Sequence, residues 1–222
     1  MLSQASGFAE DYARPVMLST PDSEGDHRCG TFIVINRSGW IVTAKHILRE
    51  ADGDYSKLMW GWKDVSIDDV MEDSDSDMAI GRLTPFDGDW VGEYPVFCDP
   101  GEIVLGKTVG RLGYTMMKED DQSSASIFQN IGIVARDYEE QGTRYFITSS
   151  PGIKGQSGGP IFDSRGRICG MQVSTRMADL GYRNMTDSGV AVPMRSDEGI
   201  GIHVGSLRKF LDAAGISYRI EG

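Results

Sequence analysis

Short apolar or alternating runs, separated by turn-forming residues, dominate the hydrophobic pattern of the chain. Most are rich in Val, Ile, Tyr and Phe, which suit a pleated strand. These runs are Thr31–Ile35, Trp40–Ala44, Leu58–Trp62, Met78–Leu83, Thr108–Tyr114, Ile127–Tyr138, Arg144–Thr148, Ile168–Ser174 and Gly189–Met194. Many short runs of this kind are typical of all-β sandwiches and barrels. The pattern therefore predicts an all-β protein.

Turn signals and one helical segment complete this pattern. Asn36–Gly39 and Asp163–Gly166 each lie between apolar runs and predict hairpin turns. Only the tail has apolar residues at helical spacing, so a helix is predicted over about residues 203–214, which Gly215 can end. His203 opens this helix as a capping or surface residue, and His27 is expected in a loop.

The charge of the chain is uneven. Its 222 residues include 22 Lys and Arg and 33 Asp and Glu, a net charge of −11. Nucleic acids and anionic membranes need a cationic surface, so neither is expected as a partner. The first 100 residues hold 19 acidic and 8 basic side chains, whereas residues 101–222 hold 14 of each. We expect two domains, residues 1–100 and 101–222, divided at Asp99–Gly101.

The cysteines and the N-terminal segment bear on the cellular compartment. Cys29, Cys98 and Cys169 are too few and too widely spaced for a disulfide framework, so reduced thiols are expected, although one bridge is open to them. The sequence shows neither a secretory signal nor an apolar run of about 18 residues that could span a membrane. These features favour a cytoplasmic protein.

Three motifs carry catalytic residue types in a fixed order. An apolar run ends at His46, another begins after Asp77, and Ser157 lies between glycines in Gly155–Pro160. A serine hydroxyl becomes a nucleophile when a histidine removes its proton, and a carboxylate must orient that histidine. Backbone N–H groups beside the serine can stabilise an oxyanion, and glycine gives the backbone the freedom to aim them. The three motifs together indicate nucleophilic acyl transfer.

Asp77 has competitors in its own segment. Asp73 and Asp75 lie close by, but Asp77 adjoins the apolar run, which would bury it beside the histidine. The alternating aspartates are also similar to a calcium-binding loop. However, Met78 stands where that loop needs glycine, and Thr84 where it needs a bidentate glutamate. We therefore expect a solvated acidic loop and no metal.

In these motifs the sequence resembles the trypsin-like serine peptidases of the chymotrypsin clan, closest in motif style to the HtrA-type branch. The order of His46, Asp77 and Ser157 is that clan's order, and the resemblance extends from about Gly30 to Phe210. It implies two antiparallel six-stranded β-barrels and a C-terminal α-helix. The histidine and aspartate would lie on the first barrel and the serine on the second.

The same resemblance implies a role for each site residue. His46 would be the general base, Asp77 its orienting carboxylate and Ser157 the nucleophile, with the N–H groups of Gly155 and Ser157 as the oxyanion hole. The segment Gln172–Thr175 would pair with the substrate backbone, and no cofactor is implied. The full set of substrate-binding residues would be Pro151, Gly152, Ile153, Lys154, Gln172, Val173, Ser174, Thr175, Asp187 and Gly189.

Departures from the secreted digestive relatives bear on activation. Gln156 precedes the serine where those relatives carry the acid that binds a new N-terminus, and Ile47 replaces a cysteine of their histidine-loop disulfide. We therefore expect an intracellular serine endopeptidase without zymogen insertion and without the PDZ module of HtrA-type proteins. Its partners would be a protein or peptide substrate and an activating or restraining protein.

Three questions remain open at this point. Asp187 precedes Gly189 by two residues and, if it reaches the specificity pocket, would favour a basic residue before the cleaved bond. The segment Gly155–Gly159 also matches the nucleophile elbow of an α/β-hydrolase esterase, with Asp187 and His203 completing its triad, although strand–helix alternation is missing. The last alternative is a catalytically silent, trypsin-like module that only binds peptides.

Overall fold

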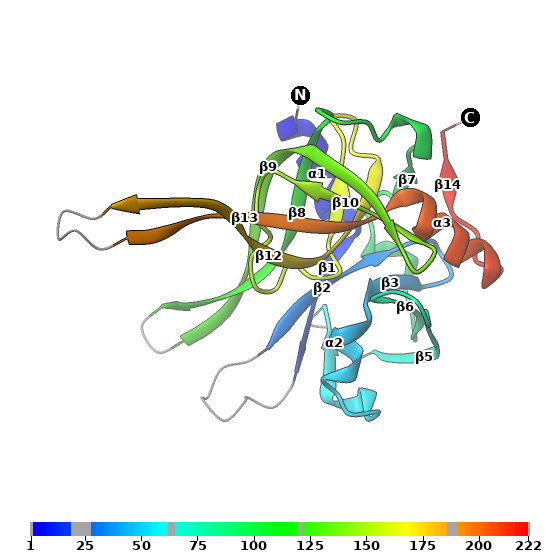
Figure 1. Ribbon diagram of the computed structural model, residues 1–222. Coiled ribbons are helices and arrows are strands. Elements are labelled where there is room, and N and C mark those ends of the chain that lie inside the picture. The colour runs from blue at the N-terminus through cyan, green and yellow to red at the C-terminus, as the bar shows by residue number, and fades with distance from the viewer. Residues whose placement is uncertain (1, 19–27, 62–64, 120–121, 186–190, 222) are drawn as a thin grey trace.

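Two β-sheets make up most of the protein (Figure 1). The computed structural model describes residues 2–18, 28–61, 65–119, 122–185 and 191–221. The first sheet takes its strands from residues 13–84 and the second from residues 96–220. The proposed division into domains 1–100 and 101–222 stays a prediction.

The first sheet has six strands in the order β4-β1-β2-β3-β6-β5, and all neighbouring pairs are antiparallel. Its core contains Phe32 and Trp60, which are fully buried and pack edge to face with ring centroids 5.3 Å apart. The strands are β1 (Ala13–Leu18), β2 (Cys29–Val34), β3 (Trp40–Ala44), β4 (Leu58–Trp60), β5 (Ser66–Glu72) and β6 (Met78–Thr84).

The second sheet is a barrel with two short strands added. Among the described residues its order is β11-β8-β9-β10-β13-β12-β7-β14, and a further pairing between β11 and β12 closes the first six strands into a ring. β7 and β14 join by parallel pairing. The strands are β7 (Val96–Phe97), β8 (Thr108–Glu119), β9 (Gln122–Glu140), β10 (Thr143–Thr148), β11 (Pro160–Phe162), β12 (Ile168–Met185), β13 (Ala191–His203) and β14 (Arg219–Ile220).

This architecture confirms the expected all-β, chymotrypsin-like fold with its C-terminal helix. The helix, α3 (Val204–Ala213), follows β13 directly. Both hairpin turns also form, because the N–H of Gly39 donates to the carbonyl of Asn36 (3.1 Å) and that of Gly166 donates to the carbonyl of Asp163 (2.9 Å).

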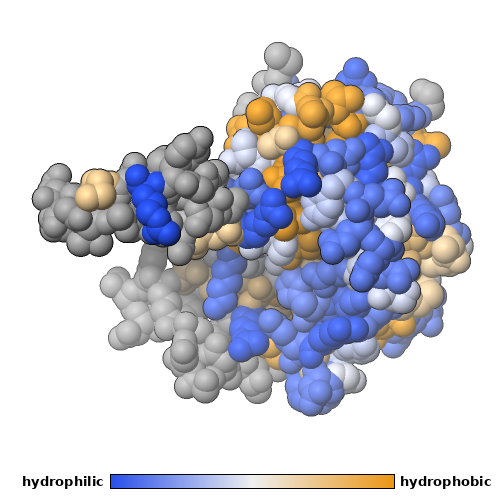
Figure 2. All heavy atoms as spheres, in the orientation of Figure 1, coloured by the Kyte–Doolittle hydropathy of each residue, from blue (hydrophilic) through white to orange (hydrophobic). Residues whose placement is uncertain are grey.

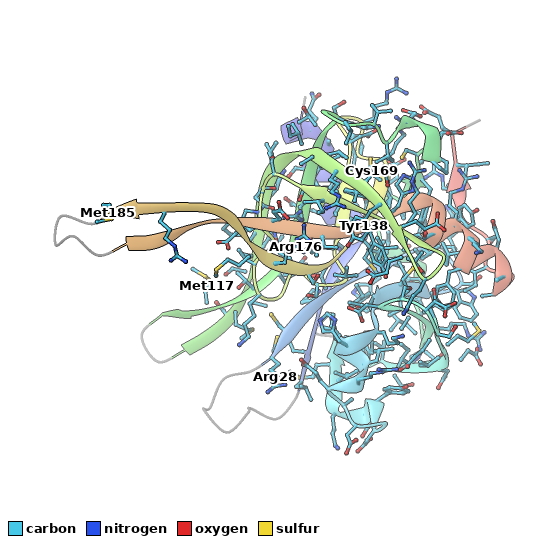
Figure 3. The ribbon with its side chains drawn as sticks, viewed as in Figure 1. Arg28, Met117, Tyr138, Cys169, Arg176 and Met185 are labelled. Carbon is cyan, nitrogen blue, oxygen red and sulfur yellow. The ribbon has the colours of Figure 1, made fainter. Side chains whose placement is uncertain are left out.

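The long strands exceed their predicted lengths. β8 pairs with β9, and β12 with β13, as two hairpins that extend beyond the barrel on the same side of the molecule (Figure 1). Met117 and Met185, labelled in Figure 3, lie on these two extensions. The predicted run Gly189–Met194 overlaps the start of β13, and residues 189–190 lie outside the described residues.

The N-terminal helix α1 (Leu2–Tyr12) was not predicted. The expectation that only the tail is helical was therefore wrong, although the tail helix itself is confirmed. It packs on the second sheet although it belongs to the acidic half of the chain. Tyr12 is buried and its hydroxyl donates to the carbonyl of Gly166 (3.1 Å), while the Ser6 hydroxyl donates to Gln129 (2.6 Å). A short helix, α2 (Lys45–Arg49), follows β3.

The surface around the first sheet is polar. Figure 2 shows a mostly hydrophilic face where α2 and β5 lie in Figure 1. In the described part of the chain, no helix is long and apolar enough to cross a membrane.

Candidate active site

His46 and Asp77 meet at one end of the first sheet. β3 pairs with β6 so that Ala44 lies opposite Met78, which brings the residues flanking these two positions together. The backbone N–H of His46 donates to Oδ1 of Asp77 (2.8 Å), and Nδ1 of His46 lies 2.6 Å from Oδ2. The N–H of Lys45 donates to the Asp77 carbonyl (3.2 Å). The carboxylate therefore fixes both the position and the orientation of the imidazole.

The electrostatics of this pair suit a base that must hold a proton temporarily. The hydrogen bond that His46 donates to Asp77 raises the pKa of His46, burial opposes that effect, and the Asp77 charge adds to the rise. Since Nδ1 donates to the carboxylate, Nε2 is the nitrogen left to accept a proton in the neutral ring.

The neighbouring aspartates serve their own loop. Oδ1 of Asp73 accepts the N–H of Asp75 (3.0 Å), and Oδ2 accepts the hydroxyl of Ser76 (2.9 Å). The Lys45 ammonium donates to the Asp73 carbonyl (2.5 Å). Of the three candidate aspartates, Asp77 is the one that contacts the histidine.

Ser157 lies on the loop between β10 and β11, and glycines shape that loop. Gly155 has φ +97° and Gly158 has φ +80°, both in the left-handed region. A Cβ on Gly155 would lie 2.1 Å from the carbonyl oxygen of Tyr114, and one on Gly158 would lie 2.1 Å from that of Thr31. Close approach to these backbones therefore requires glycine at both positions.

Thr31 joins this loop to the first sheet. Its N–H donates to the Ser157 carbonyl (2.8 Å), and its hydroxyl donates to the Gly155 carbonyl (2.9 Å) while accepting the N–H of Tyr114 (2.9 Å). A Cβ on Gly158 would lie 2.4 Å from the hydroxyl of Thr43 on β3, the strand that leads to His46. Sequence analysis missed Thr31, whose signal is a polar residue within an apolar strand.

The Ser157 hydroxyl and two backbone N–H groups beside it make few hydrogen bonds within the described residues. The Ser157 hydroxyl lies 3.4 Å from the Val173 carbonyl, and within the described residues it makes no hydrogen bond to His46. The backbone N–H groups of Gly155 and Ser157 likewise have no acceptor among the described residues. These two N–H groups are thus available to an incoming oxygen.

Gln156 anchors the loop that carries Ser157 through both ends of its side-chain amide. It is fully buried; its Oε1 accepts the N–H of Ile153 (3.0 Å), and its Nε2 donates to the Phe128 carbonyl (3.1 Å). Both ends of the amide are therefore used, which gives the residue before Ser157 a structural role.

The segments expected to wall the substrate pocket lie side by side. The Thr175 hydroxyl donates to the Gly152 carbonyl (2.9 Å), which joins β12 to the 151–154 segment. The Gly158 N–H donates to the Gln172 carbonyl (2.7 Å), which joins β12 to the loop that carries Ser157. Asp187 and Gly189 lie outside the described residues. Pro151, Ile153, Lys154, Val173 and Ser174 belong to these same two segments.

His203 does not take part in this site. Its Nδ1 accepts the N–H of Gly205 (3.0 Å), which confirms that it caps α3, although it is fully buried rather than on the surface. β11 follows the serine loop directly and its sheet neighbours are antiparallel. An α/β-hydrolase needs a helix there and a parallel sheet, so the esterase alternative is wrong.

A separate cavity of about 420 Å³ lies away from these residues. Its lining combines α1, the turn at Gly166 and the strands β7 and β14, and it contains none of the site residues.

Comparison with known proteins agrees with this geometry. A family model described as the trypsin-like peptidase domain matches residues 30–171. Comparison with curated protein sequences gives no match. An HtrA-type protease, AlgW, solved with a tripeptide, is similar with a TM-score of 0.62 and 12% identity, over 96% of this chain and 63% of that chain. The active form of the Rv3671c protease from M. tuberculosis has a TM-score of 0.62 and 14% identity, over 98% and 86%.

The fold and the site thus define a serine peptidase of the trypsin-like class. The family model covers more than half of the sequence, so the chain belongs to the trypsin-like peptidase domain family. At these identities the solved structures bear on the fold alone. The chain spans 63% of the length of the HtrA-type chain that it matches.

Proposed function

We propose that the protein is a serine endopeptidase in which Ser157, His46 and Asp77 act as the catalytic triad. The observation that carries the proposal is the 2.6 Å contact between Nδ1 of His46 and Oδ2 of Asp77, at the end of the strand against which the Ser157 loop packs. The strand that leads to His46 therefore packs against the glycine-shaped loop that carries Ser157, which supports the proposal.

The mechanism begins with a rotation of the Ser157 side chain from the Val173 carbonyl towards His46. Nε2 takes the hydroxyl proton as Oγ forms a bond to the scissile carbonyl carbon. The carbonyl π electrons move onto oxygen, where the N–H groups of Gly155 and Ser157 can stabilise the negative charge. Collapse of this intermediate breaks the C–N bond, and the imidazolium gives its proton to the leaving amine.

In the second half of the reaction, water attacks the acyl-enzyme through the same series of steps. His46 removes a proton from the water as its oxygen attacks the ester carbon, and returns that proton to Ser157 as the C–Oγ bond breaks. Asp77 stays ionised throughout and stabilises the imidazolium at both steps. No cofactor takes part in this proposal.

The substrate is a protein or peptide bound as an extended strand along Gln172–Thr175. The pairing of β12 with β11 ends at Met171, and beyond it β13 is the strand paired with β12 among the described residues. Ser174 and Thr175 are exposed there, so this part of β12 has an open edge. An incoming backbone can pair with such an edge.

Activation does not use insertion of a new N-terminus. The position before the serine holds a neutral amide whose oxygen and nitrogen both have backbone partners, so Gln156 offers no anion to an ammonium group. Control by a protein partner fits this arrangement. The free thiols of Cys98 and Cys169, with their Sγ atoms 3.8 Å apart, favour a reducing compartment such as the cytoplasm.

Labelling with a fluorophosphonate probe tests the proposal. The probe should modify Ser157 in the wild-type protein, and neither Ser157→Ala nor His46→Ala should react at a comparable rate. Ser164→Ala, in the hairpin turn outside the site, is the matched control and should label normally. A folded wild-type protein that binds peptides but resists the probe would instead support the silent peptide-binding module.

A further inference from the structure

Two cavities adjoin each other at the outer edge of the second sheet, and none of the proposed triad residues lines either of them. The cavity of about 420 Å³ described above lies between α1, the turn at Gly166 and β14. A second cavity, of about 320 Å³, lies between the turn at residues 35–38 and the segment 217–219. Tyr94 and Arg219 line both cavities. Together the two form one groove, which we call the C-terminal groove.

The C-terminal groove follows an open strand edge. β14 is the last strand in the order of the second sheet (Figure 1); it pairs with β7 on one side and, within the described residues, with no strand on the other. Arg219, Ile220 and Glu221 are all exposed. An open edge offers backbone N–H and C=O groups to an extended chain. A peptide can therefore add a strand beside β14.

The 420 Å³ cavity offers apolar surface, and its charges are already paired. Phe8 and Ile220 line it and are 46% and 54% exposed. At its rim the carboxylate of Glu221 pairs with Arg165 (3.1 Å) and with Arg167. Because these charges compensate one another, what remains to be covered is the apolar surface. This cavity therefore suits a large apolar side chain.

The 320 Å³ cavity has the opposite character. Arg37 and Arg219 line it and no aspartate or glutamate does, although the chain has a net charge of −11. Arg219 pairs with Glu93 (3.5 Å), whereas the exposed Arg37 forms neither an ion pair nor a hydrogen bond within the described residues. The hydroxyls of Ser38 and Ser217, which also line the cavity, have no hydrogen-bond partner in that part of the chain either. A guanidinium and two hydroxyls are thus available to a carboxylate.

We propose that the C-terminal groove binds an extended segment of a partner protein in which an acidic side chain lies two residues from a large apolar one. The acidic side chain pairs with Arg37, the apolar side chain lies between Phe8 and Ile220, and the backbone between them pairs with β14. Residues two apart in a strand share a face and lie roughly 6–7 Å apart, which suits adjoining cavities. This inference does not depend on the proposed peptidase function.

The two cavities supply the selectivity that the strand edge lacks. β14 is short and carries charged residues, which are features that discourage unselective pairing at a sheet edge. Backbone hydrogen bonds alone are therefore not enough to hold a partner there. The Asn36 side chain donates to the Ser217 carbonyl (2.8 Å) and so joins the first sheet to the groove. A bound segment consequently contacts both halves of the protein.

The test is a set of short fluorescein-labelled peptides that differ only in a central motif, which is Glu-Thr-Leu, Lys-Thr-Leu or Glu-Thr-Ser. Each motif is made in both chain directions, because parallel and antiparallel pairing with β14 place the two side chains in opposite order. The Ser157→Ala protein is used so that no probe is cleaved. Fluorescence polarisation should give a Kd below about 1 mM for Glu-Thr-Leu in one direction, and at least about tenfold weaker binding for the other motifs.

Three results with these probes would overturn the proposal. They are failure of both Glu-Thr-Leu peptides to bind, equal binding of the glutamate and lysine peptides, and equal binding of the leucine and serine peptides.

A charge reversal tests the contact with Arg37 directly. Arg37→Glu should weaken binding of the Glu-Thr-Leu peptide at least about tenfold and strengthen binding of the Lys-Thr-Leu peptide, which a merely structural effect would not do. Arg136→Glu replaces an exposed arginine on β9 that lines neither cavity, and this matched control should leave both affinities unchanged. Unchanged affinities in Arg37→Glu would exclude the proposed ion pair.

A second pair of variants tests the apolar cavity. Ile220→Ser should weaken binding of the Glu-Thr-Leu peptide at least about tenfold but that of the Glu-Thr-Ser peptide little. Ile131→Ser is the matched control, because Ile131 on β9 is 53% exposed and lines neither cavity. Ile220 and Arg37 are both exposed, so their variants should fold, which circular dichroism checks. Peptides that bind in the substrate cleft would keep full affinity for both groove variants, and the proposal would then be wrong.

Discussion

The Thr31 hydroxyl donates a 2.9 Å hydrogen bond to the carbonyl of Gly155, so that a buried strand of the first sheet holds the loop that carries Ser157. The same hydroxyl accepts the N–H of Tyr114 from β8. One side chain therefore ties together both sheets and the proposed oxyanion donors.

Replacing Thr31 should loosen this loop. Thr31→Val keeps the shape but leaves the Gly155 carbonyl and the Tyr114 N–H unpaired, at a cost of roughly 1–3 kcal/mol in the free energy of unfolding. We expect kcat to fall at least about tenfold, because the loosened loop would stabilise the oxyanion less well. A loss of about 1.4 kcal/mol in transition-state stabilisation lowers a rate tenfold. Thr31→Ser retains the hydroxyl and should stay close to wild type in both urea unfolding and steady-state kinetics.

The pH dependence of activity should follow His46. Catalysis needs the neutral imidazole, and the hydrogen bond that His46 donates to Asp77 raises the pKa of His46 above its ordinary value of 6.5. The rate kcat/KM should therefore rise with pH through a midpoint above 6.5. Asp77→Asn removes the main cause of that shift, so the midpoint should move to lower pH while kcat falls by several orders of magnitude. If the midpoint does not change in Asp77→Asn, Asp77 does not set the pKa of the catalytic base, and its proposed role is wrong.

His203 should make the fold sensitive to acid. Burial lowers its pKa to about 4, so the unfolded chain binds this proton more readily than the folded one. The stability is fully present above the unfolded pKa of about 6.5 and is lost as pH falls towards 4. His203→Asn keeps an acceptor for the Gly205 N–H and should lose less unfolding free energy than wild type between pH 7 and pH 5. Equal losses in urea titrations would contradict this assignment.

The ion-pair cluster at the turn after β11 should stabilise the second barrel. Arg167, whose side chain is 6% exposed, donates to the carboxylates of Asp163, Glu102 and Glu221. Arg167→Gln leaves the buried Asp163 carboxylate with Lys107 (3.6 Å) as its ion-pair partner among the described residues, and should lower the free energy of unfolding by about 3 kcal/mol. Arg82→Gln breaks an exposed pair with Asp69 and should change it by less than about 1 kcal/mol. Similar losses for both variants would show that burial does not decide the effect.

Local chemistry made much of the site predictable. Glycine on both sides of Ser157, and strands that end beside His46 and begin beside Asp77, are signals within a few residues of each functional group. The structure brings the histidine and the aspartate into contact, and it places the serine loop against the same strand. The catalytic roles themselves remain predictions until activity is measured.

Other parts depend on contacts between distant segments. α1 contains small and polar residues with little helical patterning, and it is stabilised by packing on the second sheet. Arg111 and Asn130 both donate to the Pro151 carbonyl, which is possible because β8 and β9 place them opposite each other. In the sequence, Arg111 is only a single charged residue within an apolar run, and its buried contacts follow from the pairing register, which the local pattern does not give.

The division of the active site between two sheets has a consequence during synthesis. A chain whose first sheet has formed on the ribosome holds the proposed base and its carboxylate but not the proposed nucleophile, because residue 157 and the strands that support it emerge later. Closure of the barrel by β11 and β12, together with docking of the loop on Thr31, completes the site last. If the proposed triad is correct, proteolytic activity is therefore withheld until the second sheet has formed, which protects neighbouring nascent chains.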